Sequence, residues 1–174
     1  MNPIDLLTKE HEKIIVVADA LDKESSLLEK GKGVNEEFLI NVIKFIRNYA
    51  DKFHHAKEED ILFKELCKKE NEKNMHCNPV EQMLIEHDEG RKFIRGIEEG
   101  MKEKNKRKII NNARGYVNLI REHIFKEDNI LYPMSEEALG RKTKKEMEKK
   151  FADAEKKMKN EKERQLAFAR GLRK

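Results

Sequence analysis

The stretch that decides the fold is HHAKEEDILF, residues 54–63, because the chain repeats it with few changes as HIFKEDNILY, residues 123–132. In both copies a glutamate follows the first histidine by four residues. Residues four apart share one face of an α-helix. The repeat therefore predicts two helices that each present one imidazole and one carboxylate to the same side.

Asparagine, proline and glycine divide the chain into long helical segments. Asn2–Pro3 and Asn78–Pro79 each have the pattern of a helix N-cap followed by a proline in the first turn, and Asn35 can cap another helix. The expected helices span residues 3–30, 36 to between 66 and 70, 79–104 and 106–132, with Pro133 ending the fourth, and a fifth amphipathic segment covers residues 143–172.

Each segment carries apolar residues at helical spacing. The expected core includes Leu7, Ile14, Leu39, Ile43, Ile46, Met83, Leu84, Ile94, Leu119, Ile120 and Ile130. Long amphipathic helices joined by short links are typical of a bundle. The sequence therefore predicts an all-α fold: an antiparallel up-down four-helix bundle over residues 1–139, with an additional C-terminal amphipathic helix in residues 140–174 that packs on the bundle or on a partner.

Composition favours the same fold class and narrows the classes of partner. Charged residues make up 41% of the chain and apolar residues 37%, with little glycine and proline, which is typical of helical proteins. No apolar run approaches the roughly 20 residues that a membrane-spanning helix needs, and the first residues lack the order of a signal peptide. We therefore expect a cytoplasmic protein without a membrane partner.

The last segment is the basic part of the chain. Lysine and arginine outnumber acidic residues from Arg141 onward, but the two signs alternate as on a solvated helix face. No nucleic-acid motif accompanies them, so no nucleic-acid partner is expected, and a homodimer through this helix is the alternative to packing on the bundle. Cys67 and Cys77 are expected to be free thiols in a reducing compartment, with a redox pair or a metal site including His76 as the weaker alternative.

Each of the four main stripes is interrupted by one histidine, and two stripes carry a carboxylate one turn further on. The residues are His11, His54 with Glu58, His87, and His123 with Glu127. At about 1.5 Å per residue, the histidines of the first two helices lie at nearly the same level, and so do those of the last two. The interior of the bundle should therefore contain four imidazoles and two carboxylates at matched heights.

Such a set favours a bound cation. Any one of these histidines, taken alone, is more often an ordinary core residue than a ligand. Buried carboxylates, however, need a partner, and two buried together would repel each other or shift their pKa values. A dinuclear cluster bridged by Glu58 and Glu127 and faced by four neutral imidazoles satisfies all six groups. Nitrogen and oxygen donors without thiolate suit iron, with manganese or zinc as substitutes.

The set of motifs made by His11, HHAKEE, EHDEGR and HIFKEDNILYP resembles the hemerythrin-like, HHE cation-binding domains over roughly residues 2–135. The resemblance implies a four-helix bundle that holds a non-haem di-iron centre: two iron ions joined by an oxo, hydroxo or water bridge. Members of that family bind or sense dioxygen, handle peroxide or nitric oxide, or sense and store iron. The resemblance implies that the metal ligands are His11, His54, Glu58, His87, His123 and Glu127.

The sequence departs from the oxygen-carrying hemerythrins on the third helix. Those proteins have a second histidine one turn after the first, where this chain has Arg91, which cannot ligate as a cation. They also use an aspartate five residues after the last histidine, and Asp128 stands there. A further ligand could come from Asp128, His55, solvent or an acid of the fifth helix such as Glu155. Aligning the two repeats pairs His55 with Ile124 and favours a place behind the ligands or at the rim, with an auxiliary ligand as the alternative.

Three functions fit a dinuclear centre. The first is a metal-binding protein that binds, senses or buffers O2, NO, peroxide or iron. The second is an enzyme that turns over peroxide or NO, and the third is an interaction module with a structural metal site. The expected apolar lining, with Arg91 or Tyr116 at the access, comprises Ile15, Ile46, Leu84 and Ile120.

Overall fold

The computed structural model describes residues 2–68 and 78–172, and every regular element in these two ranges is a helix. The elements are α1 (Pro3–Glu29), α2 (Glu36–Phe45), η1 (Ile46–His55), η2 (Glu58–Leu62), α3 (Phe63–Leu66), α5 (Asn78–Lys102), α6 (Lys106–Lys126), η3 (Glu127–Leu131), α7 (Tyr132–Ala138) and α8 (Arg141–Gly171). The η elements are π-helical, with backbone hydrogen bonds between residues five apart instead of four. The predicted all-α fold class is confirmed.

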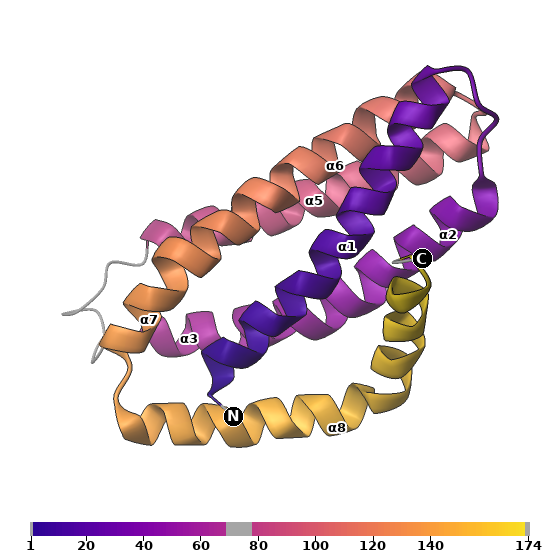
Figure 1. Cartoon of the computed structure of the whole chain (residues 1–174). Helices are drawn as coiled ribbons and strands as arrows, with labels where there is room; N and C mark the ends of the chain where they lie inside the picture. The colour runs from indigo at the N-terminus through magenta and orange to yellow at the C-terminus, as the bar shows by residue number, and fades with distance from the viewer. Residues whose placement is uncertain (1, 69–77, 173–174) are drawn as a thin grey trace.

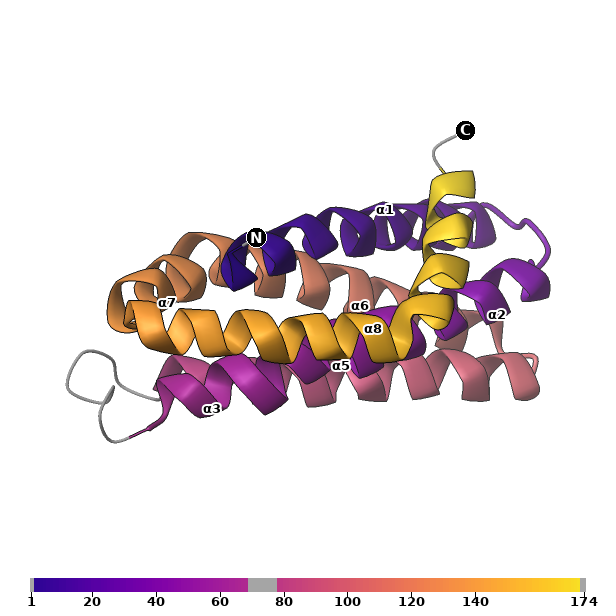
Figure 2. The ribbon, with the colours of Figure 1, turned by 90° about the horizontal axis from the view of Figure 1, so that it is seen from below.

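Four long helical stretches lie alongside one another: α1, the run from α2 to α3, α5, and the run from α6 to α7 (Figure 1). In Figure 1 successive stretches run in opposite directions. The closest packing joins α5 to α6 and α1 to α6. Helix α8 lies outside these four, across α1 and the run from α2 to α3, and bends toward α2 in its last part (Figures 1 and 2).

Local sequence explains where the helices begin and end. The side-chain oxygens of Asn2, Asn35 and Asn105 each accept a hydrogen bond from a backbone N–H in the first turn of α1, α2 and α6, at 3.0–3.1 Å. These caps satisfy N–H groups that have no partner inside the helix. After α1, Gly31 adopts a left-handed φ of 95°, which glycine tolerates without strain. The caps at Asn2 and Asn35 follow the sequence prediction.

The sequence predicted that Pro133 would end the fourth helical stretch, but the stretch continues beyond it. The π-helical turn η3 interrupts the α-helical hydrogen-bond ladder, and the chain continues as α7 to Ala138. Pro133 therefore falls in the first turn of a new α-helical segment, where the N–H that proline lacks is not needed. Proline is still confined to the first turn of an α-helical segment, but the π turn before it makes that segment a continuation of the same stretch.

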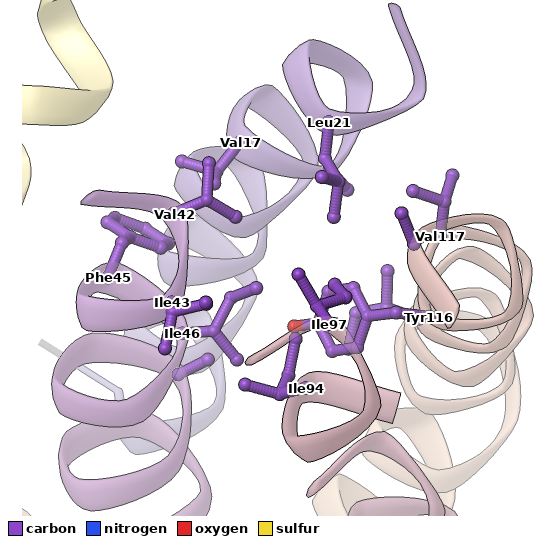
Figure 3. Packing of buried hydrophobic residues seen from close by; sticks show 14 of the residues in the cluster. Val17, Leu21, Val42, Ile43, Phe45, Ile46, Ile94, Ile97, Tyr116 and Val117 are labelled. Atoms are coloured by element: carbon purple, nitrogen blue, oxygen red, sulfur yellow. The ribbon is translucent and has the colours of Figure 1, made fainter. Parts of the chain in front are cut away.

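Two apolar clusters form the core. The larger cluster joins α1, α2, η1, α5 and α6, and Figure 3 shows Val17, Val42, Ile97 and Val117 converging from these helices. The smaller cluster lies toward the other end of the bundle and includes Leu7, Leu62, Met83 and Leu131. In each long stretch the buried residues between the two clusters are mainly polar, and we call them the polar layer.

Two residues expected in the core lie at the surface. Leu84 is 39% exposed and Ile130 is 50% exposed. On α5 the inward face follows Met83 and His87, so Leu84 falls beside it. Ile130 corresponds to Ile61 of the other repeat, which is 9% exposed and lies beside Ala154 and Met158 of α8. Helix α8 packs on the run that carries Ile61, whereas Ile130 lies on the run from α6 to α7.

Helix α8 packs on its own bundle, which is one of the two predicted arrangements. Met147 and Phe151 are buried in the smaller cluster and Ala169 in the larger one. A homodimer through this helix stays a prediction. No helix in the described ranges is long and apolar enough to cross a membrane.

The free-thiol prediction is wrong for Cys67, which is disulfide-bonded. It rested on the redox compartment, whereas pairing depends on whether the chain brings two sulfur atoms together. His76 and Cys77 lie outside the described residues.

The contact between α5 and α6 depends on glycine. A Cβ atom on Gly115 would lie 2.3 Å from Cε1 of Phe93, which no side chain could tolerate without movement of its neighbour. The absence of that atom lets the two helices approach closely. This pair of helices also carries His87 and His123.

Candidate metal centre

The polar layer contains the six residues that the sequence singles out. They are His11 on α1, His54 in η1, Glu58 in η2, His87 on α5, His123 on α6 and Glu127 in η3, and each is at most 3% exposed. Imidazole and carboxylate groups are rarely buried so completely without a partner. The structure thus brings all six to one level of the bundle.

The donor atoms form two groups that share Glu58. One group consists of His11, His54, Glu58 and Glu127, the other of His55, Glu58, His87 and His123, and in each group the four donor atoms lie within 4.8 Å of one another. We call them the first and the second position.

Both carboxylates stand between the positions. Oε2 of Glu58 lies 3.7 Å from Nε2 of His54 and 3.5 Å from Nε2 of His87. Oε2 of Glu127 lies 3.2 Å from Nε2 of His11 and 3.3 Å from Nε2 of His123. Each carboxylate thus faces one histidine of each position.

His55 belongs to this cluster, and its predicted place at the rim is wrong. It is 4% exposed, and its ring stacks on His87 with centroids 3.8 Å apart and planes at 15°. The physical reason is η1, because π-helical turns contain more residues than α-helical ones and so separate neighbouring side chains by a smaller angle. His54 and His55 can then both face inward. In the sequence only the pair of adjacent histidines indicated that His55 could face inward, because α-helical spacing places it away from the core.

Every histidine of the centre is oriented by a carboxylate. The Nδ1 atoms pair with Asp128 (His11), Glu10 (His54), Asp51 (His55), Glu59 (His87) and Glu86 (His123), at 2.8–3.0 Å. In a neutral imidazole that donates through Nδ1, the Nε2 atom carries the free lone pair. All five Nε2 lone pairs are then available to the interior. Carboxylate–histidine pairs of this kind are typical of metal sites.

The inward-facing atoms lack ordinary hydrogen bonds. Among the described residues, Nε2 of His54 and of His55, Oε2 of Glu58 and both oxygens of Glu127 are buried without a hydrogen-bond partner. Nε2 of His87 lies 3.1 Å from Nε2 of His123, so two acceptor atoms crowd each other when both rings are neutral. Buried polar atoms are normally paired, and cations at the two positions would satisfy all of these.

In the metal-free protein, protonated histidines balance the negative charge of the buried carboxylates. Burial opposes charge on His11 and His123, but hydrogen bonds and negative charge from the carboxylates around them prevail and raise the pKa of His11 to about 9 and that of His123 to about 10. Burial lowers the pKa of His54 to about 3. Burial and the charge of Glu127 raise the pKa of Glu58 well above its usual value. The metal-free centre therefore holds two imidazolium ions at neutral pH.

The centre has an approximate two-fold relationship that follows from the sequence repeat. In one half Glu10 binds both His54 and Lys57, and in the other half Glu86 binds both His123 and Lys126. Glu59 on His87 corresponds in the same way to Asp128 on His11. Sequence reasoning missed the roles of the carboxylates and lysines. The sequence does contain a pattern that points to them: a glutamate precedes the histidine in Glu10–His11 and Glu86–His87, and a lysine precedes the glutamate in both repeats.

Two substitutions break this relationship. Where one repeat has Phe63, the other has Tyr132, whose hydroxyl donates to Oε1 of Glu58 at 2.6 Å and lies 3.3 Å from Nε2 of His11. Where one repeat has His55, the other has Ile124. The first position therefore has a phenol beside it, and the second has a third imidazole.

A small cavity adjoins the second position. It offers about 10 Å³ to the centre of a water-sized molecule and is lined by Asp51, His55, Glu86, His87, Gly90, Tyr116, Leu119, Ile120 and His123. This is close to the space that one water molecule needs. Tyr116 was expected near the access to the centre, and its buried hydroxyl has no hydrogen-bond partner among the described residues.

The remaining candidate ligands lie outside the two positions. The Asp128 carboxylate binds Nδ1 of His11 and so orients a ligand. Oε1 of Glu155 on α8 lies 3.4 Å from Nζ of Lys57, which separates it from the donor atoms. Arg91 binds Glu59 at 2.6 Å.

The donor set suits a metal such as iron, manganese or zinc, since it offers imidazole and carboxylate groups without thiolate. A family model described as the hemerythrin HHE cation-binding domain matches residues 2–135. No curated protein and no solved structure matches the chain. The matched range covers most of the chain and includes both positions. The chain belongs to the hemerythrin HHE cation-binding family.

Proposed function

We propose that the chain binds two iron ions and uses them to bind a small ligand such as O2, NO or peroxide. In this proposal His11, His54, Glu58, His87, His123 and Glu127 are ligands, and His55 is a seventh. The observation that carries it is the pair of four-donor groups that share Glu58, with inward atoms that have no hydrogen-bond partner within residues 2–68 and 78–172. A single cation could not satisfy both groups.

The composition of the two positions favours iron. Two imidazoles and two carboxylates surround the first position, and three imidazoles with one carboxylate surround the second. Mixed nitrogen and oxygen sets of this kind suit iron, with manganese and zinc as substitutes. When bound, two iron ions would supply open coordination positions and reversible redox chemistry for a small ligand.

The protein's own residues prepare the centre for such a ligand. The five carboxylates fix the imidazole rings, and the two apolar clusters exclude water from both sides of the layer. Tyr132 holds one oxygen of Glu58 through its hydroxyl. The cavity next to His55 and His87 provides room for a molecule of about the size of water.

Gly90 provides a test of this ligand site. A Cβ atom there would lie 3.6 Å from Cε2 of Tyr116 and 3.7 Å from Cδ2 of Leu119, which is ordinary contact, yet it would occupy part of the cavity. Gly90→Ala should stabilise α5 by up to about 1 kcal/mol, because alanine favours helix. It should also weaken NO binding to the iron-loaded protein roughly tenfold or more, the scale of one misplaced methyl group in a close-fitting pocket.

The measurement is a titration of the anaerobic, iron-loaded full chain with NO, followed by absorption spectroscopy. Gly33→Ala is the matched control, because a Cβ atom there would meet nothing within 4 Å. Saturable NO binding that is lost in Gly90→Ala and kept in Gly33→Ala would support the proposal. An iron-loaded wild-type chain whose spectrum does not respond to NO would contradict it.

A further inference from the structure

We propose that Arg91 is a positioning residue for the second metal position, acting on His55 and His87 through two carboxylates. The inference rests on the proposed function, because it concerns one of the two metal positions. Arg91 lies on α5 one turn after His87 and does not itself contribute a donor atom. Its role follows from what its guanidinium group touches.

One guanidinium group contacts both carboxylates that orient these histidines. Nη2 of Arg91 donates to Oε1 of Glu59 at 2.6 Å, and the same oxygen pairs with Nδ1 of His87 at 2.8 Å. Nε of Arg91 lies 3.6 Å from Oδ1 of Asp51, and that oxygen pairs with Nδ1 of His55 at 3.0 Å. In each case the arginine and the imidazole are linked through a single carboxylate oxygen.

This arrangement makes the two imidazoles depend on one cation. The rings of His55 and His87 stack at 3.8 Å, so their Nδ1 carboxylates are held near each other as well. Two neighbouring carboxylates repel unless a positive charge lies between them. The planar fork of arginine can bind two carboxylates at fixed angles, which a lysine ammonium group cannot reproduce. Asp88 holds Nη1 at 2.9 Å on the outer side and fixes the guanidinium plane.

Among the described residues, no single cation is seen to contact both carboxylates that orient the histidines of the first position, since Lys57 binds Glu10 alone of the two. On α1 the residue one turn after His11 is Ile15. His11 and His54 are oriented instead by Asp128 and Glu10, neither of which Arg91 is seen to contact among the described residues. Removing Arg91 should therefore weaken one metal position and leave the other unchanged.

The test is a titration of the chelator-stripped full chain with Co²⁺, whose absorption spectrum reports the ligands of each bound ion. In Arg91→Met the affinity of one of the two equivalents should fall roughly tenfold, the lower end of the about 10- to 100-fold loss seen when a direct partner of a metal ligand is removed, because Arg91 acts through those partners. Arg91→Lys should give an intermediate loss. Arg47→Met is the control, since it removes an arginine paired to Glu98 at 2.5 and 2.6 Å and should leave both equivalents unchanged.

A double-mutant comparison separates positioning from a general effect on folding. If Arg91 acts through the two carboxylates, Arg91→Met should cause no further loss in an Asp51→Asn, Glu59→Gln background. An equal loss in that background, or an equal weakening of both equivalents, would overturn the inference. So would unchanged binding in Arg91→Met. A wild-type chain that binds fewer than two Co²⁺ ions would instead contradict the proposed function.

Discussion

Lys57 should contribute more to stability than Lys126, although the two occupy equivalent places in the repeat. Lys57 is 1% exposed, contacts Glu10, and lies 3.8 Å from the centre of the Phe53 ring. Removing one member of a buried ion pair costs about 3 to 5 kcal/mol, because the remaining charge stays buried. Glu10 keeps its hydrogen bond to His54, so Lys57→Met should cost about 3 kcal/mol, the lower end of that range.

Lys126→Met is the matched control. The side chain of Lys126 is 34% exposed, and its partner Glu86 keeps hydrogen bonds from Gln82 and His123. An ion pair with this exposure contributes about 1 kcal/mol or less. The assay is urea unfolding of the metal-free proteins followed by circular dichroism, where 3 kcal/mol corresponds to a midpoint lower by about 1.5 M at a slope of about 2 kcal/mol per M. Equal shifts for the two variants would refute the reasoning from burial.

Three further outcomes follow from the structure. Metal binding at pH 7 should release protons, and metal affinity should rise between pH 7 and pH 9, because the pKa values of about 9 for His11 and about 10 for His123 keep both rings protonated in the metal-free protein. Calorimetry in buffers of different ionisation enthalpy measures the proton release. Metal binding without proton release would contradict these pKa values. Gly115→Ala should lower the free energy of unfolding by about 1 to 3 kcal/mol through overpacking against Phe93, measured by urea unfolding beside the wild type. Glu155→Gln should leave the number of bound metal ions unchanged, as measured by elemental analysis, because its carboxylate pairs with Lys57 outside the centre.

Helical periodicity was sufficient to predict the fold class and the level of the polar layer. The histidines of the four stripes were placed correctly because three of them lie on ordinary α-helical segments, where residues four apart share a face. Capping at Asn2 and Asn35 was equally readable, because the interaction is local.

The errors arise where the backbone leaves the α-helix. The π-helical segments η1 and η3 turned His55 inward and carried the chain past Pro133. No single residue type specifies a π turn, so α-helical spacing was applied where it did not hold. Contacts between distant residues were also hidden, because neither the carboxylate held against each Nδ1 nor the disulfide at Cys67 follows from spacing along one helix.

In the proposed function two metal ions bind between the four helical stretches and share Glu58. Elemental analysis of protein from iron-supplied cells, combined with Mössbauer spectroscopy, tests it directly. The wild-type protein should contain two iron ions per chain, coupled through a bridge, and Glu58→Gln should lose the coupled signal. Fewer than about half an equivalent of any transition metal, in protein never exposed to chelator, would contradict it.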